Sequence, residues 1–176
     1  TNYTGFTVDK LVGAAFNEAP KTNIDTRDSI SYMLEDANGS GGDLHQVARS
    51  VVQENTITGR LGLLVNYPYT GGQALSKQEV EALDLKASIH QYPAEAIPNW
   101  GVKNGRLDYI NIKESKLSNP EDKFSHDADE GNRIYYMGDD NLCYQQYIED
   151  GGTFDETEGV LVTDFNGNGF KEIPFT

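Results

Sequence analysis

Two adjacent carboxylates, Asp139 and Asp140, close the run Tyr-Met-Gly-Asp-Asp over residues 136–140. A carboxylate pair at a hairpin tip can hold divalent ions for nucleotidyl transfer. That chemistry also needs a carboxylate from another strand and a basic path for template, which a formal net charge of −14 opposes. Gly, Asp and Asn are equally the residues that a tight connection between strands requires. We therefore predict a hairpin turn at residues 138–141.

A second group of oxygen-bearing residues matches the start of a calcium loop. Asp164, Asn166, Asn168 and Gly169 occupy its first, third, fifth and sixth positions. The twelfth position, where a bidentate Glu is needed, is Phe175, and an alternating pattern follows instead of a helix. We predict a β-turn built from Asn-Gly-Asn-Gly, with calcium binding as the alternative.

The remaining reactive side chains form no pattern that predicts a site. The three histidines, at positions 45, 90 and 126, share no ligand spacing with cysteine or paired carboxylates. Cys143 is the only cysteine, so it fits burial or a reducing compartment, and it lacks a local activating signature. We expect no catalytic residue, no cofactor and no metal site, and hence no enzyme.

Length and composition limit the class of protein. The chain has 176 residues, of which 37% are hydrophobic, enough for one globular domain or two small ones. No apolar run reaches the length of a membrane-spanning helix. The excess of Asp and Glu opposes binding to phosphate backbones or anionic lipid, so we expect no membrane partner and no specific DNA binding.

Helical periodicity dominates the first third of the chain. Apolar residues recur at helical spacing over 8–16 and over 24–34, and Pro20 should end the first helix. Asp43, with Gln46 three residues later, predicts an N-cap for a helix that runs to about Thr58. The segment 38–42, Asn-Gly-Ser-Gly-Gly, predicts a loop between the second and third helices.

Strand patterns begin after residue 58. Residues 60–67 predict a buried strand, Ser76 and Glu79 form a capping box for a helix to about Ser88, and residues 89–92 predict a second strand. A single turn should follow over 93–97. Alternating patterns then predict strands in an antiparallel meander, at 107–112, 134–137, 142–148, 159–165 and 170–175.

These patterns together predict an α+β fold. A helical segment, residues 1–58, should pack on a mainly antiparallel part, residues 59–176, in one compact unit overall. The acidic stretch 114–130 contains Pro120 and one large apolar residue, Phe124, so we predict a solvated loop that could serve as an interaction element.

The order of several segments resembles a family of tailed-bacteriophage portal-like proteins that carry a domain of unknown function. The blocks are GFTVDKLVGAAFNEAP, DLHQVARSVVQENTITGRLGLLVNYP, QYPAEAIPNW, RLDYINIKES, NRIYYMGDDNLCYQQY and KEIPF. They cover nearly the whole chain. Two positions depart from the family pattern, since Asn66 replaces an acid before Tyr-Pro and Pro98 replaces an aliphatic residue before Asn-Trp.

The resemblance implies a portal, or head-to-tail connector, in which a ring of usually twelve subunits surrounds the passage for DNA. This chain would form the outer, wing-like part of the subunit, at a capsid vertex of the virion and in the host cytoplasm during assembly. The implied partners are other copies of the subunit and the capsid, terminase and tail adaptor proteins. Family members extend beyond this carboxyl end and have no catalytic residues to transfer.

Ring closure between acidic subunits needs basic residues at the contacts. The candidate residues are Arg49, Arg60, Arg106 and Arg133, although Arg60 could equally be buried inside one subunit. The alternative function is an acidic, β-rich module that binds carbohydrate or calcium. On the portal interpretation, we expect the isolated chain to be monomeric.

Overall fold

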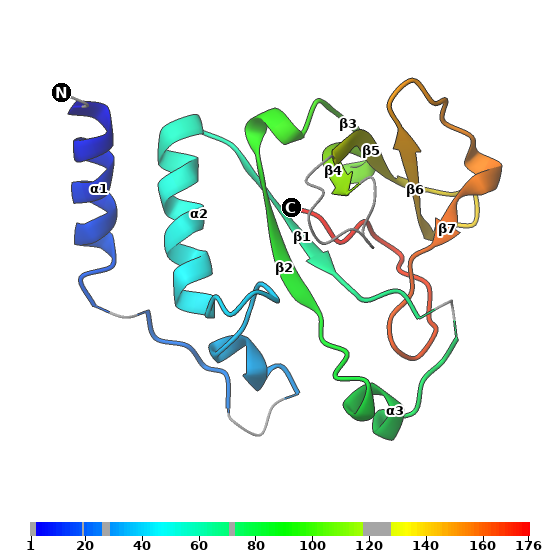
Figure 1. Ribbon diagram of the computed structural model, residues 1–176, viewed down its shortest axis with the longest axis horizontal. Helices are drawn as coiled ribbons and strands as arrows, with labels where there is room; N and C mark the ends of the chain where they lie inside the picture. Colours follow the sequence, from blue (N-terminus) through cyan, green and yellow to red (C-terminus); the bar gives the residue numbers. More distant parts are fainter. Residues whose placement is uncertain (1–2, 19, 26–28, 71–72, 118–127) are drawn as a thin grey trace. The chain divides into compact units, whose positions relative to one another are not determined.

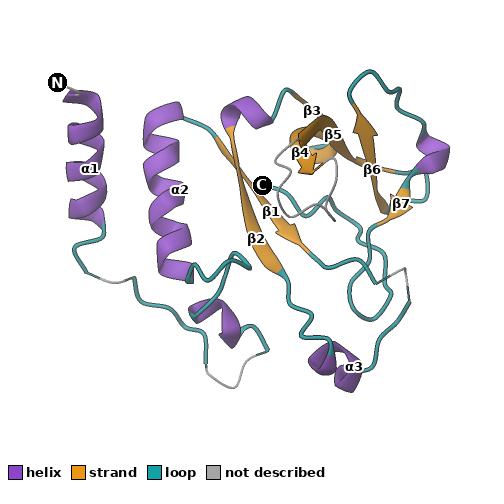
Figure 2. Cartoon of the chain, viewed as in Figure 1, coloured by secondary structure: helices purple, strands orange, loops and turns teal. Residues whose placement is uncertain are grey.

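The computed structural model describes residues 3–18, 20–25, 29–70, 73–117 and 128–176. It has a helical amino-terminal part followed by mainly antiparallel sheets, which confirms the predicted α+β class (Figures 1 and 2). Two compact units divide the chain. The first contains Thr1–Asn66, Lys86–Ala94 and Thr176, and the second contains Tyr67–Leu85 and Glu95–Phe175. The boundary at residue 58 stays a prediction.

Two helices lie side by side in the first unit (Figure 1). They are α1, Tyr3–Ala15, and α2, Leu44–Thr58. Val8 and Val12 of α1 and Val47 of α2 are buried, as their helical spacing predicts. Asp43 caps α2 by accepting a 2.7 Å hydrogen bond from the Gln46 amide, and Gly59 ends it at φ 73°.

The predicted helix over 24–34 is largely wrong. Only the 3-10 helix η1, Ser31–Leu34, forms there, and residues 26–28 lie outside the described part of the chain. Side chains satisfy the backbone that follows η1: Asp36 accepts from the Ser40 amide at 3.1 Å, and Asn38 accepts from the Gly42 amide at 2.9 Å. Such local hydrogen bonds compete with helix formation.

A two-stranded sheet completes the first unit. Strand β1, Leu61–Asn66, pairs antiparallel with β2, Ser88–Pro93, in the register that sets Leu64 opposite His90. Both strands were predicted. Thr176 extends this pairing, because its amide and carbonyl exchange hydrogen bonds of 2.9 and 2.8 Å with Leu63.

Helix α3, Lys77–Ala82, opens the second unit and is shorter than predicted. The capping box is confirmed: Ser76 Oγ accepts from the Glu79 amide, and the Glu79 carboxylate accepts from the Ser76 amide at 2.8 Å. The Ser76 hydroxyl also donates to Glu79 Oε2 at 2.7 Å, and this bond, together with the one from the Ser76 amide, holds the pKa of Glu79 below its usual value. The helix does not reach Ser88, because Asp84 adopts φ 48° and turns the backbone out of the helical path.

Five antiparallel strands form the sheet of the second unit in the order β3-β4-β5-β6-β7. Their bounds are Asn99–Lys103, Arg106–Leu117, Ala128–Met137, Cys143–Glu149 and Val160–Leu161. The 3-10 helices η2, Ala94–Ala96, and η3, Glu156–Glu158, precede β3 and β7. The turn predicted over 93–97 is therefore confirmed.

One face of this sheet contributes the core of the second unit. Ile110 and Ile112 alternate with less buried neighbours along β4, and Tyr135 and Cys143 lie beside them on β5 and β6. The registers place Ile110 opposite Tyr135, and Met137 opposite Cys143. This alternation confirms the period-two pattern that predicted these three strands.

The sheet differs from the prediction at both ends of the acidic stretch and at its last strands. Residues 114–117 and 128–130 are strand instead of loop, and 118–127 lie outside the described residues. The predicted strand 159–165 is reduced to β7 and an isolated bridge from Thr163 to Gly169, and no strand includes residues 170–175. Pro174 has no amide hydrogen for a ladder, which disfavours a strand there.

Candidate functional site

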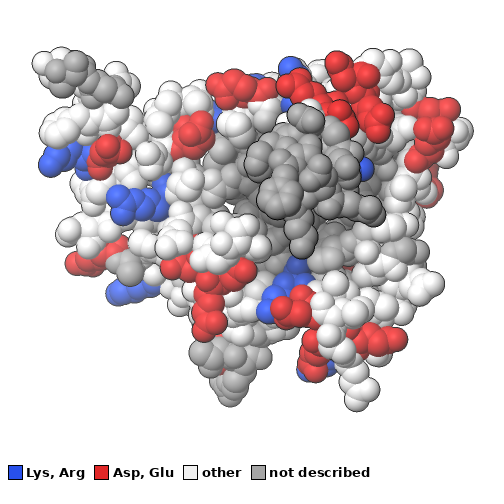
Figure 3. All heavy atoms as spheres, in the orientation of Figure 1, with Lys and Arg blue, Asp and Glu red and all other residues white. Residues whose placement is uncertain are grey.

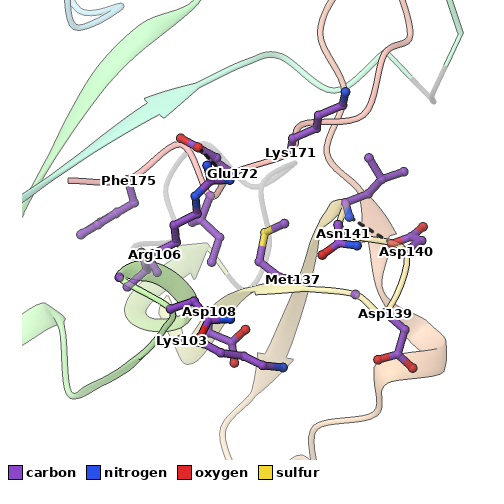
Figure 4. Close-up of a pocket in the computed structure, with 16 residues that line it drawn as sticks. Lys103, Arg106, Asp108, Met137, Asp139, Asp140, Asn141, Lys171, Glu172 and Phe175 are labelled. Atoms are coloured by element: carbon purple, nitrogen blue, oxygen red, sulfur yellow. Dashed lines mark hydrogen bonds and ion pairs between the residues drawn. The ribbon is translucent and has the colours of Figure 1, made fainter.

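One hollow of the second unit lies where three loops meet, and the carboxylate pair singled out in the sequence is among its lining residues (Figure 4). Its volume is about 890 Å³. The β3–β4 turn, the β5–β6 turn and the segment 171–175 line it. The first and third carry charged side chains of both signs, and the β5–β6 turn carries only acidic ones (Figure 4). Those labelled are Lys103, Arg106, Asp108, Asp139, Asp140, Lys171 and Glu172.

The turns that bound this hollow were predicted, and backbone geometry explains them. Asn104 and Gly105 both have positive φ, 53° and 79°, as a two-residue hairpin turn requires. Asn141 has φ 58° in the second turn, where the Gly138 amide donates to Leu142 O at 2.9 Å. The hairpin at residues 138–141 is confirmed.

Asp139 and Asp140 do not converge. Asp140 accepts hydrogen bonds from the Leu142 amide at 3.0 Å and from Tyr144 Oη at 2.8 Å, so its oxygens hold the turn. Asp139 makes no such bond with the described residues, and its carboxylate points away from that of Asp140 (Figure 4). The Tyr144 hydroxyl has a raised pKa, chiefly because its phenol donates to Asp140.

Metal ligands do not gather elsewhere in the described chain. Among those residues, no three His, Cys, Asp or Glu side chains are placed to hold an ion. His45 packs edge-on against Phe16 with ring centroids 5.4 Å apart, and His90 contacts Ser88 Oγ at 3.1 Å. His126 lies outside the described residues.

The loop at Asp164 uses its carboxylate to order its own backbone. Asp164 Oδ1 accepts from the amides of Asn166 and Asn168 at 2.8 and 2.9 Å, and Oδ2 accepts from the Asn168 side chain at 3.1 Å. Partial burial raises the pKa of Asp164, but the hydrogen bonds from Asn168 and Asn166 outweigh it and leave the pKa below the ordinary value. Both oxygens are thus engaged without an ion, and the predicted turn forms with Gly167 at φ 77°.

Cys143 is fully buried on β6. Burial raises the pKa of its thiol to about 12, because the thiolate would lose its hydration. The nucleophilic form is therefore disfavoured at neutral pH, and the side chain packs as a small apolar group.

Three of the four candidate arginines have partners within the chain. Arg133 Nε lies 2.8 Å from Glu114 Oε2, and Arg106 lies 3.3 Å from Glu172 in an exposed pair. Arg60 donates to the carbonyl of Ala94 at 2.8 Å. Arg49 on α2 is exposed and forms no ion pair with another described residue, so it is the candidate left available for an external contact.

The acidic residues are spread over the surface. On the face drawn in Figure 3, Asp and Glu side chains are interspersed with fewer Lys and Arg side chains. No helix among the described residues combines the length and apolar character needed to cross a bilayer.

Comparison with protein-family models and with curated proteins finds no significant match. Sequence reasoning also did not bring Lys103, Asp108 and Lys171 together with Asp139. Lys103 and Asp108 share the β3–β4 hairpin, whereas Asp139 and Lys171 lie in segments distant in sequence, so no local spacing relates the three segments. The sequence did predict the two hairpin turns that bound the hollow. Whether those turns lie close together, however, depends on the order of the strands in the sheet.

Proposed function

We propose that this chain is a structural module of a tailed-phage portal, the ring-shaped head-to-tail connector. It forms part of the outer, wing-like region of a subunit in the virion. It contacts neighbouring copies, and the complete ring engages capsid, terminase and tail adaptor proteins. In this role the chain makes and breaks no covalent bonds, and DNA passes through the ring without specific binding.

The observation that carries the proposal is the correspondence between the resembling blocks and the structural elements. The first block covers most of α1, and the second covers α2 and β1. The third block contains η2 and parts of the strands on either side of it. The fourth lies in β4, and the fifth spans the β5–β6 hairpin. A resemblance whose blocks coincide with buried elements is what a shared scaffold requires, which supports the portal interpretation.

Charge supports the same role. Each copy contributes a net charge of −14, and a ring of such copies repels the DNA phosphates that must move past it. The same charge opposes ring closure unless a basic residue of one copy meets a carboxylate of the next. Arg49 suits that contact because it is exposed and has no ion pair within the described chain.

The test uses the complete reading frame that encodes this chain, expressed and imaged by negative-stain electron microscopy. We expect rings with a central channel, and Arg49→Glu should lower their yield several-fold, because charge reversal places two like charges at the contact. Lys77→Glu is the control, since Lys77 is 90% exposed and its contact is to Glu81 of the same helix.

Two outcomes are distinguishable. A complete protein that remains monomeric, or forms no channel-bearing ring, contradicts the portal proposal. Rings whose yield falls equally in Arg49→Glu and Lys77→Glu leave the portal role standing and contradict the specific role of Arg49.

A further inference from the structure

A second, smaller hollow lies on the opposite face of the same five-stranded sheet from the Ile110–Ile112 core. Its volume is about 310 Å³. Aromatic rings and hydrogen-bond acceptors line it, and none of the described residues that line it is Lys or Arg. The lining residues are Asn99, Asp108, Tyr109, Asn111, Ile134, Tyr136, Met137, Phe154 and Glu156.

Two adjacent rows of the sheet form the floor. One row runs from Asn99 on β3 through Asn111 on β4 to Ile134 on β5. The next row contains Tyr109 and Tyr136, opposite each other on β4 and β5. Side chains two residues apart on a strand share a face and are separated by roughly 6.5 Å, so the rows form one continuous surface.

The tyrosine at the edge of this floor has a fixed place. The Tyr109 ring lies across Gly101 of β3, where any Cβ atom would collide with it. The absence of a side chain at Gly101 therefore lets the ring lie against the neighbouring strand. Tyr109 still exposes 37% of its surface, so one part of the ring is accessible to a ligand.

The segment that precedes β7 supplies the wall, and three groups of contacts anchor it to the sheet. Tyr136 Oη donates to the Glu156 carbonyl at 2.8 Å, and the Phe154 ring meets the Tyr136 ring edge-on at 5.1 Å. Gln146 on β6 is buried and accepts from the Asp155 amide at 3.2 Å. Anchoring of this kind holds Phe154 and Glu156 in place before any ligand arrives, which reduces the entropic cost of binding.

Carboxylate and amide oxygens supply the acceptors of the hollow, and the side-chain NH2 groups of Asn99 and Asn111 can also donate. The carboxylates of Asp108 and Glu156 form no ion pair or hydrogen bond with the described residues. The side-chain oxygen of Asn111 is buried and has no hydrogen-bond partner. Rotation about the soft terminal torsion of Asn can turn that oxygen toward a donor.

We propose that this hollow binds a guanidinium group, as carried by an arginine side chain. A guanidinium is planar, stacks on aromatic faces and presents only donors, so it complements aromatic walls, two free carboxylates and an unsatisfied amide oxygen. A sugar would offer acceptors as well as donors and gains less from a lining so rich in acceptors. The inference rests on this hollow alone and is independent of the portal proposal.

The probe is N-acetyl-arginine methylamide, titrated into the 176-residue chain and followed by two-dimensional NMR. We expect shifts at Tyr109, Asn111 and Phe154, with a dissociation constant on the order of 1 mM for so small a ligand. The citrulline analogue has the same planar shape without charge and should bind at least about tenfold more weakly. Methyl glucoside tests the sugar alternative.

Glu156→Gln removes one carboxylate with little change of shape, and we expect about threefold to tenfold weaker binding of the arginine probe. Asp139→Asn is the matched control, because it removes the same charge from the exposed β5–β6 turn outside this hollow. The NMR spectrum of each variant reports whether its fold is retained. Phe154→Leu provides a second variant, which should weaken binding by removing one aromatic wall.

Several results would overturn the inference. These are an absence of shifts up to about 20 mM arginine probe, equal binding of the citrulline analogue, tighter binding of methyl glucoside, or equal losses in Glu156→Gln and Asp139→Asn. Shifts that map to the hollow, depend on charge and weaken only in the Glu156 and Phe154 variants support it. Two further measurements identify the source of the arginine. Binding of an arginine-containing peptide indicates an arginine of another protein, whereas loss of contact between copies in the Arg49→Glu protein indicates Arg49 of a second copy.

Discussion

Asp164 illustrates how one carboxylate can resemble a metal ligand and yet act on its own backbone. Both of its oxygens accept hydrogen bonds from Asn166 and Asn168, the two residues that the calcium motif assigns as fellow ligands. These hydrogen bonds order the backbone of the loop.

Removal of this carboxylate should destabilise the loop. We expect Asp164→Ala to lower the free energy of unfolding by about 1 kcal/mol, since several partly exposed hydrogen bonds are lost. Urea denaturation at neutral pH measures the change, and Asp139→Ala serves as the control because the described residues offer Asp139 no hydrogen bond. An unchanged midpoint in Asp164→Ala would show that the hydrogen bonds contribute no net stability.

The same carboxylate adds a pH dependence of known sign. Its folded pKa lies below the ordinary value of 3.8, so the charged form is favoured by folding. The stabilisation is complete above the ordinary pKa and is lost as the pH falls through the lower folded pKa. The stability difference between wild type and Asp164→Ala should accordingly shrink in acid.

At the scale of elements, helix ends are determined by short-range hydrogen bonds. Asp43 starts α2, and the reciprocal bonds of Ser76 and Glu79 start α3. The carboxyl-terminal ends of these two helices were not equally predictable. Gly59 stops α2 where a glycine is expected, whereas Asp84 stops α3 with a conformation that few side chains adopt, so its position was not anticipated.

Asp43 offers a direct test of capping. Asp43→Ala should destabilise the first turn of α2 by about 1 kcal/mol, because the Gln46 amide loses its acceptor. Asp43→Asn keeps an acceptor at the same place and should lose much less. Hydrogen exchange of the Gln46 amide reports the change, and equal protection in the two variants would contradict a capping role.

For the whole molecule, net charge is the dominant electrostatic property. Fourteen basic residues face 28 acidic ones, and basic groups such as Arg106 and Arg133 already pair with carboxylates of the same chain. The excess of acidic residues opposes both phosphate contacts and attraction between copies. Electrostatic repulsion between negative charges should therefore keep the isolated chain from binding DNA and from associating with other copies.

We expect no retardation of duplex DNA in a gel at low salt, at protein concentrations up to about 100 μM. Sedimentation of the same sample should show a monomer. A basic DNA-binding domain run in parallel is the positive control. A salt-sensitive shift of the DNA would mean that the basic residues act together on one face, and the charge argument would then be wrong.

Local signals account for what could be predicted. The cap at Asp43, the capping box at Ser76 and the turn at Asn104-Gly105 each depend on residues within a few positions of one another. The alternation in β4 to β6 likewise identifies which residues are buried. Cys143 and Ile110 were therefore assigned to strands correctly, because a half-buried strand repeats every two residues.

Other features depend on partners distant in the sequence. Strand β3 contains Gly101 and a bulge and lacks a strong pattern of its own; pairing with β4 makes it a strand. The segment 170–175 alternates as a strand does, yet it forms no strand, because within it only Phe170 exchanges backbone hydrogen bonds with Val162 and Cys143. Both hollows lie between loops or rows far apart in the chain.

The sequence by itself determined the α+β class, the helix caps, most turns and the charge. Tertiary structure alone decided that β1 pairs with β2, that Asp139 and Asp140 point apart, and that Tyr109, Phe154 and Glu156 line one hollow. The physical reason is the separation in sequence over which the interactions act. Caps and turns are closed by hydrogen bonds between near neighbours, whereas a binding surface is set by packing among segments whose separation in sequence carries no information about distance in space.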